Sequence, residues 1–465
     1  MNRPASREAA IAAAQHHFDS RAFHADLARR VAMPTESQNA ERGATLMAYL
    51  TDELAVAFGA MGFTTQMVDG APGKPPFLIA ARIEDQSRPT VLGYGHGDVI
   101  RGLDSEWRAG LSPWVLTEEG DRLYGRGTAD NKGQHSINLA ALAAVLQTRG
   151  RLGFNVKFLI EVGEEIGSPG LAEVCRAHRE ALRADVFIAS DGPRLHPERP
   201  TLFLGSRGVK NFDLVLDLRP GAHHSGNWGG LIADPGIRLA HAIASITDRR
   251  GAIRVAQWRP APIADSVRRA LADCEPGGGE DGPAVDPDWG EPGLTPAERV
   301  FGWSSFAVLA ARVGNPAHPV NAIAGKAWAR CQLRFVVGID AEDIVPALRR
   351  HLAREGFADI AVVETGDEVM RATRLDPDTP WVRWAVAGIA RTTGKKPAIL
   401  PNLGGSLPNE VFSEILGLPT LWIPHSYAAC SQHAPNEHML AHTAREGLAI
   451  MAGLYFDLGE SDVPR

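Results

Sequence analysis

The chain has 465 residues, of which 44% are hydrophobic and 22% charged, as is ordinary for a globular protein. This composition excludes a disordered chain, a collagen and a coiled coil, and the length predicts two to four domains at roughly 100–200 residues each. The 48 Lys and Arg residues against 55 Asp and Glu residues give a net charge of −7. We therefore expect neither a nucleic acid nor a membrane as a partner.

The four cysteines lie far apart and form no CxxC pair, which excludes a disulfide scaffold and a thiolate zinc site. Cysteines used in this way favour a reducing compartment, so we expect a cytoplasmic protein. The first twenty residues lack the apolar core of a signal peptide and predict an amphipathic helix. No stretch reaches about 18 uncharged apolar residues, so no transmembrane helix is expected.

Predicted strands and helices alternate in the first part of the chain. Residues 1–60 predict helices. Apolar runs rich in Val, Ile and Phe predict strands at 90–95, 155–163 and 185–190, and helices are predicted between them at 134–148 and 170–183. Alternation of this kind predicts an α/β domain with a mainly parallel sheet.

The middle of the chain has a different pattern. Residues 209–218 and 327–337 alternate apolar and polar side chains, which predicts half-buried strands, and helices are expected near 234–248 and 341–355. The stretch 274–298 is rich in Gly, Pro and Asp and predicts a long, mobile loop. Buried strands return at 397–400 and 419–424. We therefore expect an α/β domain of residues 1–206 and 373–465, interrupted by a smaller α+β domain of residues 207–372.

Polar side chains follow the predicted strands. His96 and Asp98 end the first strand, and Asp98 is placed to accept the second ring N–H of His96, as in an oriented metal-bound histidine. Glu164 and Glu165 follow the second strand, and adjacent residues point to different sides, so that one can bind a metal while the other stays free as a base. Asp191 follows the third strand. Each is equally compatible with an ordinary capped turn or an exposed loop.

Two further residues complete the set. Asp130 lies in the glycine-rich GRGTADNKGQ before a predicted helix, where a capped turn is the alternative, and His433 lies in a Pro/Asn loop, where a surface histidine is the alternative. The carboxyl ends of parallel strands meet at one sheet edge, so these residues are expected to converge there. Histidine and carboxylates without thiolates suit divalent ions, and the count predicts two metals with one shared carboxylate, roughly 3.5–4 Å apart.

The motifs, taken together, resemble a known family. They are GHGDV (95–99), YGRGTADNKG (124–133), EVGEEIGSPG (161–170), SDG (190–192), HHSGNWGG (223–230), GGS (404–406) and HAPNE (433–437). In this order they resemble the dinuclear metallopeptidase family of aminoacylase, carnosine dipeptidase, glutamate carboxypeptidase, acetylornithine deacetylase and succinyl-diaminopimelate desuccinylase.

The resemblance implies roles for the converging residues. His96, Asp130 and Asp191 match the ligands of one metal. Asp130, Glu165 and His433 match those of the other, so that Asp130 bridges. Asp98 matches the residue that orients His96, Glu164 matches the general base, and a cis peptide is implied after Asp130. Two divalent metal ions per subunit are expected, zinc first, with manganese or cobalt as alternatives.

The resemblance also makes the inserted domain a lid that carries a homodimer interface. Here His224 matches a histidine that reaches the partner's active site to stabilise an oxyanion. Arg334 matches an arginine that holds a substrate carboxylate, although strand alternation allows an outward-facing arginine equally well. Asn321 matches a lid asparagine near the substrate. Gly404, Gly405 and Ser406 match the loop that binds the substrate terminus.

Two departures concern the substrate pocket. Dipeptidase relatives usually have Arg-Glu before Gly-Gly-Ser, where this chain has Asn402 and Leu403, and deacetylase relatives tend to have Gly-Gly-Thr followed by Asp, where it has Leu407 after Ser406. The C-terminal pocket is therefore expected to be less cationic than in a typical dipeptidase.

The predicted function is hydrolysis of an amide bond in a dipeptide, at a C-terminal residue or in an N-acyl amino acid. The alternatives are a non-catalytic metal-binding scaffold and a metal-independent serine amidase using Ser406 or Ser225. Neither serine lies in a G-x-S-x-G context, and no ligand or base is missing from the motifs.

Overall fold

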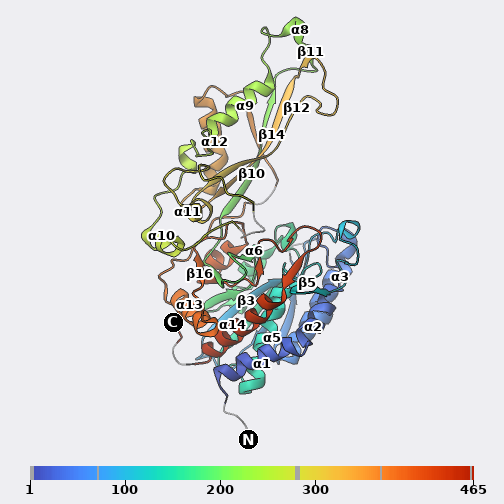
Figure 1. Cartoon of the computed structure of the whole chain (residues 1–465), viewed down its shortest axis with the longest axis vertical. Helices are drawn as coiled ribbons and strands as arrows, with labels where there is room; N and C mark the ends of the chain where they lie inside the picture. The colour runs from blue at the N-terminus through green and yellow to red at the C-terminus, as the bar shows by residue number, and fades with distance from the viewer. Residues whose placement is uncertain (1–4, 71–72, 278–282, 367–368, 461–462, 465) are drawn as a thin grey trace.

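The computed structural model describes residues 5–70, 73–277, 283–366, 369–460 and 463–464. Two sheets lie along the long axis of the molecule (Figure 1). The larger sheet, with its helices, holds both termini, and the smaller sheet extends away from it.

The larger sheet has eight strands in the order β1-β2-β6-β3-β7-β17-β9-β16. Their bounds are β1 (Thr64–Val68), β2 (Phe77–Arg82), β3 (Thr90–His96), β6 (Asn155–Glu161), β7 (Val186–Ala189), β9 (Thr201–Phe203), β16 (Ala398–Leu400) and β17 (Thr420–Trp422). Strands β6, β3, β7 and β17 run parallel to one another. The pairs β1–β2, β2–β6 and β17–β9 are antiparallel. The predicted α/β class with a mainly parallel sheet is confirmed.

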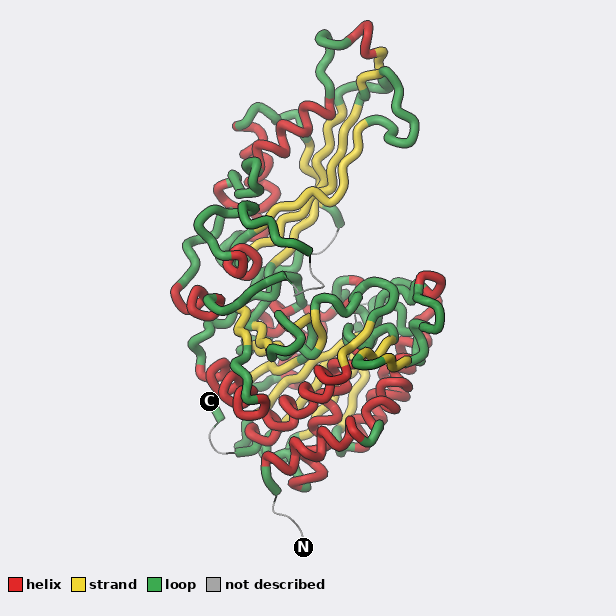
Figure 2. The backbone as a smooth tube through the Cα atoms, viewed as in Figure 1, coloured by secondary structure: helices red, strands yellow, loops and turns green. Residues whose placement is uncertain are grey.

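Helices cover the larger sheet (Figure 2). The N-terminal and C-terminal helices pack together with the central helix, and their apolar faces share one core with the sheet, including Leu142, Phe158 and Leu448. These helices are α1 (Arg7–Asp19), α2 (Ala22–Val31), α3 (Gly43–Ala48), α4 (Ala55–Ala60), α5 (Lys132–Arg149), α13 (Pro380–Thr393) and α14 (Ala441–Leu458), with a π-helical turn at Tyr49–Leu54. The single helix expected over 170–183 is instead α6 (Leu171–Ala177) and α7 (Arg179–Leu182), because the backbone at His178 leaves the helical conformation.

The smaller sheet is antiparallel in the order β12-β14-β10-β15. Its strands are β10 (Gly208–Asp217), β12 (Ser305–Val313), β14 (Lys326–Phe335) and β15 (Ala361–Glu364), and the predicted alternation of buried and half-exposed residues is present in β10 and β14. Helices α9 (Pro235–Ile246) and α12 (Ile344–Arg354) pack on one face, where Leu348 of α12 shares a core with Leu214 and Leu333 of the sheet. At the far tip lie β11 (His223–His224), α8 (Ser225–Trp228) and β13 (Ala322–Ile323).

One part of the segment between β10 and β12 packs on the larger sheet. Helices α10 (Asp265–Leu271) and α11 (Pro296–Phe301) place Leu271 and Phe301 in a core with Phe203 and Leu400. The predicted loop 274–298 has no helix or strand in its described residues until α11 begins, and residues 278–282 lie outside the described part.

The remaining elements are short. A three-stranded sheet joins β4 (Thr117–Glu119), β5 (Arg122–Tyr124) and β19 (His438–Leu440), and β8 (Pro193–Arg194) pairs with β18 (Ser426–Tyr427). Short helical turns occupy Ala40–Arg42, Asp104–Glu106, Glu164–Ile166, Ala256–Trp258, Ala341–Asp343 and Val411–Ile415. All four cysteines are free and buried. No helix within the described residues is long and apolar enough to cross a membrane.

Two of the segments that cross between the two sheets lie side by side. The backbone N–H of Thr373 donates to the carbonyl of Ser206 at 3.0 Å, and that of Val209 donates to the carbonyl of Met370 at 3.0 Å. The Asn402 side chain ties both crossings, because its Nδ2 donates to the carbonyls of Thr373 at 2.6 Å and Ser206 at 3.2 Å.

Candidate metal centre

The candidate centre lies at the carboxyl ends of three adjacent parallel strands. His96 is the last residue of β3, Glu164 and Glu165 form a turn just after β6, and Asp191 follows β7. Parallel pairing brings these strand ends to one edge of the sheet, where ligands bind in open α/β folds. The structure thus brings together side chains that are up to 95 residues apart in sequence.

Two groups of potential ligands share one residue. His96, Asp130 and Asp191 are buried, and their ligand atoms lie within 4.8 Å of one another, as do those of Asp130, Glu165 and His433. His96 Nε2 is 2.9 Å from Asp130 Oδ1 and 3.6 Å from Asp191 Oδ2. Each oxygen of Asp130 therefore faces a different group, which is the arrangement of a bridging carboxylate.

The second group is closed by a loop that follows β18. His433 Nε2 lies 3.2 Å from Asp130 Oδ2 and 2.9 Å from Glu165 Oε2. The loop has positive φ angles at Ser431, His433 and Asn436, a conformation that is uncommon away from glycine and costs free energy. His433 is about half exposed, so the centre opens to solvent on this side.

Asp98 links two of the strand ends. His96 Nδ1 contacts the backbone carbonyl of Asp98 at 3.1 Å, and the Asp98 carboxylate lies 3.5 Å from the same nitrogen. The carboxylate oxygens accept hydrogen bonds at 3.1 Å from the backbone N–H groups of Glu164 and Glu165. The fully buried Asp98 therefore fixes the position of the Glu164–Glu165 turn as well as facing His96.

The electrostatics of the centre fit bound cations. Burial and repulsion from Asp130 raise the pKa of Asp191 to about 6 and that of Glu165 to about 7. Burial, together with Asp191 and Glu165, also raises the pKa of Glu164 well above its ordinary value. Four crowded carboxylates with two imidazoles and no thiolate form a donor set for divalent ions, which remove the mutual repulsion of the carboxylates.

Glu437 supports the backbone of Asp130, a contact that the sequence reasoning missed. Its buried carboxylate accepts hydrogen bonds from Arg126 Nη1 at 2.8 Å and from the backbone N–H groups of Gly127, Ala129 and Asp130 at 2.9–3.1 Å. These contacts hold the backbone that presents the shared carboxylate. The signal was available, because the residue ends the HAPNE motif. The implied cis peptide after Asp130 is confirmed.

The Gly-Gly-Ser loop meets the lid arginine beside the centre. Arg334 Nη1 donates to Ser406 Oγ at 3.2 Å, and Ser406 Oγ donates to the carbonyl of Arg207 at 2.8 Å. The carbonyl of Gly404 accepts from Arg207 Nε at 2.9 Å. Leu403, Gly404 and Gly405 line one hollow with Pro193, two residues after Asp191, so the loop lies near that end of β7.

Two expected substrate residues are not at the centre of their own chain. His224 and Asn321 lie at the tip of the smaller sheet, where Ser225 N donates to the Asn321 carbonyl at 2.9 Å (Figure 1). The His224 side chain is exposed, and its Nδ1 accepts from the N–H of Gly226 at 3.1 Å. This tip is the end of the smaller sheet that lies away from β3, the strand that ends at His96 (Figure 1).

The side chain at position 402 joins two crossings of the chain. Asn402 is fully buried there. The less cationic pocket expected from this position stays a prediction, and Arg207 contacts the same loop at the Gly404 carbonyl. That arginine comes from the other crossing and lies beside Arg334.

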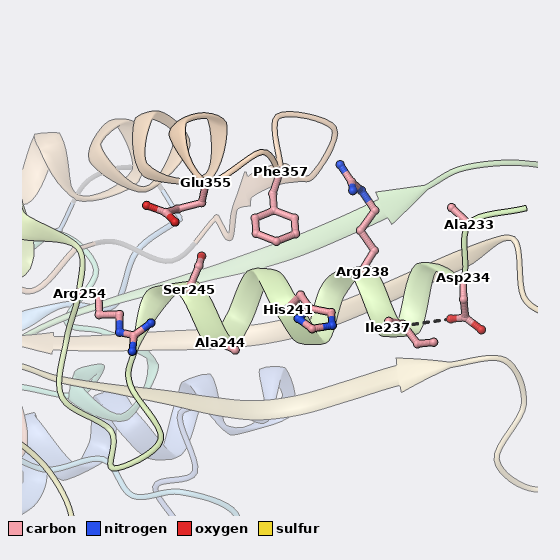
Figure 3. Close-up of a pocket in the computed structure, with 10 residues that line it drawn as sticks. All are labelled: Ala233, Asp234, Ile237, Arg238, His241, Ala244, Ser245, Arg254, Glu355 and Phe357. Atoms are coloured by element: carbon pink, nitrogen blue, oxygen red, sulfur yellow. Dashed lines mark hydrogen bonds between the residues drawn. The ribbon is translucent and has the colours of Figure 1, made fainter. Parts of the chain in front are cut away.

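A separate hollow of about 580 Å³ lies along α9 (Figure 3). It is lined by Asp234, Arg238, His241, Arg254 and Glu355 together with apolar and small residues. Arg238 there pairs with Asp359 at 2.7 Å. None of the grouped ligand residues lines this hollow, so it is distinct from the candidate centre.

Comparison with known proteins decides the family. Residues 92–457 match the profile described as Peptidase family M20/M25/M40. The chain belongs to this family. The M20 match covers most of the chain, and every residue of the two ligand groups lies within it.

The sequence identity to individual relatives is low. A Beta-Ala-His dipeptidase of Mus musculus is 34% identical over 194 residues, 41% of this chain and 39% of the relative, so the matched region spans about two fifths of that relative. A Cysteinylglycine-S-conjugate dipeptidase of Corynebacterium striatum is 29% identical over 337 residues, 70% of each chain. The solved dipeptidase Dug1p from Saccharomyces cerevisiae superposes with a TM-score of 0.78 at 20% identity, covering 97% of this M20 chain and 99% of its own, and this likeness shows the fold.

The serine amidase alternative has no support in the geometry. Ser406 Oγ contacts Arg207 and Arg334, and Ser225 Oγ donates to the Asn321 carbonyl at 3.1 Å. In the part of the chain that the structure describes, no histidine hydrogen-bonds either hydroxyl. A serine nucleophile needs a base within hydrogen-bond reach.

Proposed function

We propose that this chain is a dinuclear metallohydrolase that cleaves the amide bond of a dipeptide, of a C-terminal residue or of an N-acyl amino acid. The observation that carries the proposal is the sharing of Asp130 between two ligand groups. The Glu164 carboxylate belongs to neither group but lies near enough to Asp191 and Glu165 for their charges to raise its pKa. The dipeptidase names of the relatives favour a dipeptide.

His96, Asp130 and Asp191 would hold one ion, and Asp130, Glu165 and His433 the other. Zinc is the first candidate, and manganese or cobalt suits the same nitrogen and oxygen donors. When bound, such a pair of ions supplies charge that polarises the substrate carbonyl and lowers the pKa of a water molecule. A scaffold that binds metal without turnover would not need Glu164, whose carboxylate is not part of either ligand group.

Glu164 acts as the general base. Its carboxylate takes a proton from the attacking water and delivers it to the nitrogen of the leaving amine. Asp98 positions this carboxylate through the Glu164 N–H, and Glu437 positions Asp130 through the Asp130 N–H. Arg334 and Ser406 bind the carboxylate end of the substrate, with the backbone of Gly404 and Gly405 beside them.

A homodimer explains the position of His224. Residues 207–372 form the lid in this proposal, and its edge strand β12 leaves Val308, Leu309 and Val313 exposed, as α9 leaves Ile237. Exposed apolar residues on an unpaired strand edge are typical of an interface. Pairing of two lids would bring His224 of the partner subunit to the centre, where it stabilises the oxyanion. Asn321, at the same tip of the lid, is the asparagine that lies near the substrate in this proposal. Buried free cysteines favour a cytoplasmic location.

The test of this function is an amine-release assay on metal-stripped protein with zinc, manganese or cobalt added back. Dipeptides, N-acetyl and N-succinyl amino acids and acyl-glutamates are offered in parallel. Release that requires metal and stops in Glu164→Ala, with metal still bound, supports the proposal. Metal-independent release that a serine-reactive phosphonate inhibits would overturn it.

A further inference from the structure

Two guanidinium groups lie together at the base of the lid. Arg207 follows the first crossing, and Arg334 is on β14 directly opposite Ser305 on β12. Arg207 Nη1 donates to Ser305 Oγ at 3.0 Å, and Arg334 Nη1 donates to Ser406 Oγ at 3.2 Å. Both arginines are thus held in place by neutral hydroxyl and carbonyl oxygens.

Neither arginine has an acidic partner. Among the ion pairs of the described residues, Arg330, on the same strand as Arg334, faces Asp213 at 3.1 Å. No such pair includes Arg207 or Arg334 in the ranges that the structure describes. Arg207 is 8% exposed, so water screens its charge poorly.

Holding two like charges together without a counter-ion costs free energy. Burial, with a further contribution from Arg334, lowers the pKa of Arg207 to about 9. A bound anion would offset the repulsion between the two buried guanidinium groups. Two planar guanidinium groups can donate paired hydrogen bonds to one carboxylate. The Gly-Gly-Ser backbone and the Ser406 hydroxyl lie against the same two side chains.

We infer that Arg207 is the second cation of the subsite that binds the free carboxylate of the substrate, beside Arg334. This inference rests on the proposed function and narrows it to amides whose leaving amino acid carries a free carboxylate. It also explains why an asparagine is tolerated at position 402. In this chain the second positive charge of the subsite belongs to Arg207, at a crossing between the sheets, and not to a residue of the segment that precedes Gly404.

The position of the pair next to the ligands supports this role. Leu403, Gly404 and Gly405 line one hollow together with Pro193, which follows Asp191 by two residues. A carboxylate bound there would leave the adjoining amide directed toward the ligand groups. Arg207 therefore selects among substrates by charge, and it takes no part in proton transfer.

The experiment compares a substrate with its uncharged analogue. Metal-loaded wild type and Arg207→Gln are assayed on the best-cleaved dipeptide or N-acyl amino acid and on the same compound with its carboxyl group converted to a carboxamide. We expect kcat/KM for the acid to fall by about 10- to 100-fold in Arg207→Gln, as for loss of a charge-assisted hydrogen bond. The value for the carboxamide should change less than about twofold. Arg207→Lys should recover part of the loss.

Controls separate recognition from structure. Arg330→Gln removes a guanidinium that is paired with Asp213 on the same strand as Arg334, so it should leave the acid-to-carboxamide ratio unchanged. An equal loss on both substrates would show that Arg207 acts only through the fold and overturn the inference. Equal cleavage of both by wild type would also overturn it, while leaving the proposed hydrolase intact.

A binding measurement tests the inference even where the proposed function fails. If metal-loaded wild type cleaves no compound, the proposed function fails. Calorimetric titration of Glu164→Ala with each acid and carboxamide then still reports on the subsite. Acid-selective binding that Arg207→Gln weakens supports the inference, and binding without that selectivity overturns it.

Discussion

Replacing Glu437 by Gln perturbs the buried ion pair that holds the backbone of Asp130. The carboxylate is 1% exposed and accepts from Arg126 and from three backbone N–H groups. The amide keeps one acceptor oxygen, turns an NH₂ group toward donors and leaves the buried Arg126 guanidinium without its counter-charge. Removing one partner of a buried pair costs about 3–5 kcal/mol, so we expect unfolding free energy to fall by that amount.

Urea unfolding of the metal-stripped protein measures this change without a contribution from bound ions. Glu364→Gln is the matched control, because its pair with Lys210 is partly exposed and such pairs contribute about 0–1 kcal/mol. The double variant Arg126→Met/Glu437→Gln should be more stable than Glu437→Gln alone, since the unpaired charge is gone. A loss below about 1 kcal/mol, or no coupling between the two positions, would refute the reasoning.

Further predictions address the centre, the ions and the dimer. Asp98→Asn should lower metal affinity or turnover about 10- to 100-fold, because the Glu164–Glu165 turn loses one of the carboxylate oxygens that accept its N–H groups. Metal titration and steady-state kinetics measure the two quantities. Removing metal should lower the unfolding free energy by about 4 kcal/mol for each ion lost, relative to protein at a thousandfold excess over Kd, and an unchanged melting curve would contradict it. Leu309→Glu on the exposed strand should yield monomers in sedimentation. Mixed dimers of His224→Ala and Glu164→Ala should regain activity if the histidine acts across the interface, and confirmed mixed dimers without recovery would show that it does not.

The sequence predicted the parts of the fold that depend on local pattern. The parallel strands ending at His96, Glu161 and Ala189 have short apolar runs, and their ends could be placed from composition alone. Convergence of the polar residues then followed from the geometry of parallel strands. Which residue bridges came from the family resemblance, and the structure gives each oxygen of Asp130 a different neighbour.

Contacts between distant segments could not be predicted in this way. Nothing local to Asn402 indicates that its amide joins two crossings of the chain, and nothing local to Arg207 indicates an arginine beside it on β14. Helix α10 likewise belongs by sequence to the inserted segment but packs on the larger sheet, because its apolar face meets Phe203 and Leu400 there. Such pairings depend on how the whole chain folds back on itself.

The most direct test of the account is the metal-dependent release of amine by wild type and Glu164→Ala, with bound metal counted in both proteins. The account predicts two ions per subunit in each protein, turnover in wild type that is lost on chelation and restored by zinc, manganese or cobalt, and almost none in Glu164→Ala. Equal turnover in the two proteins, or turnover that survives complete removal of metal, would contradict it.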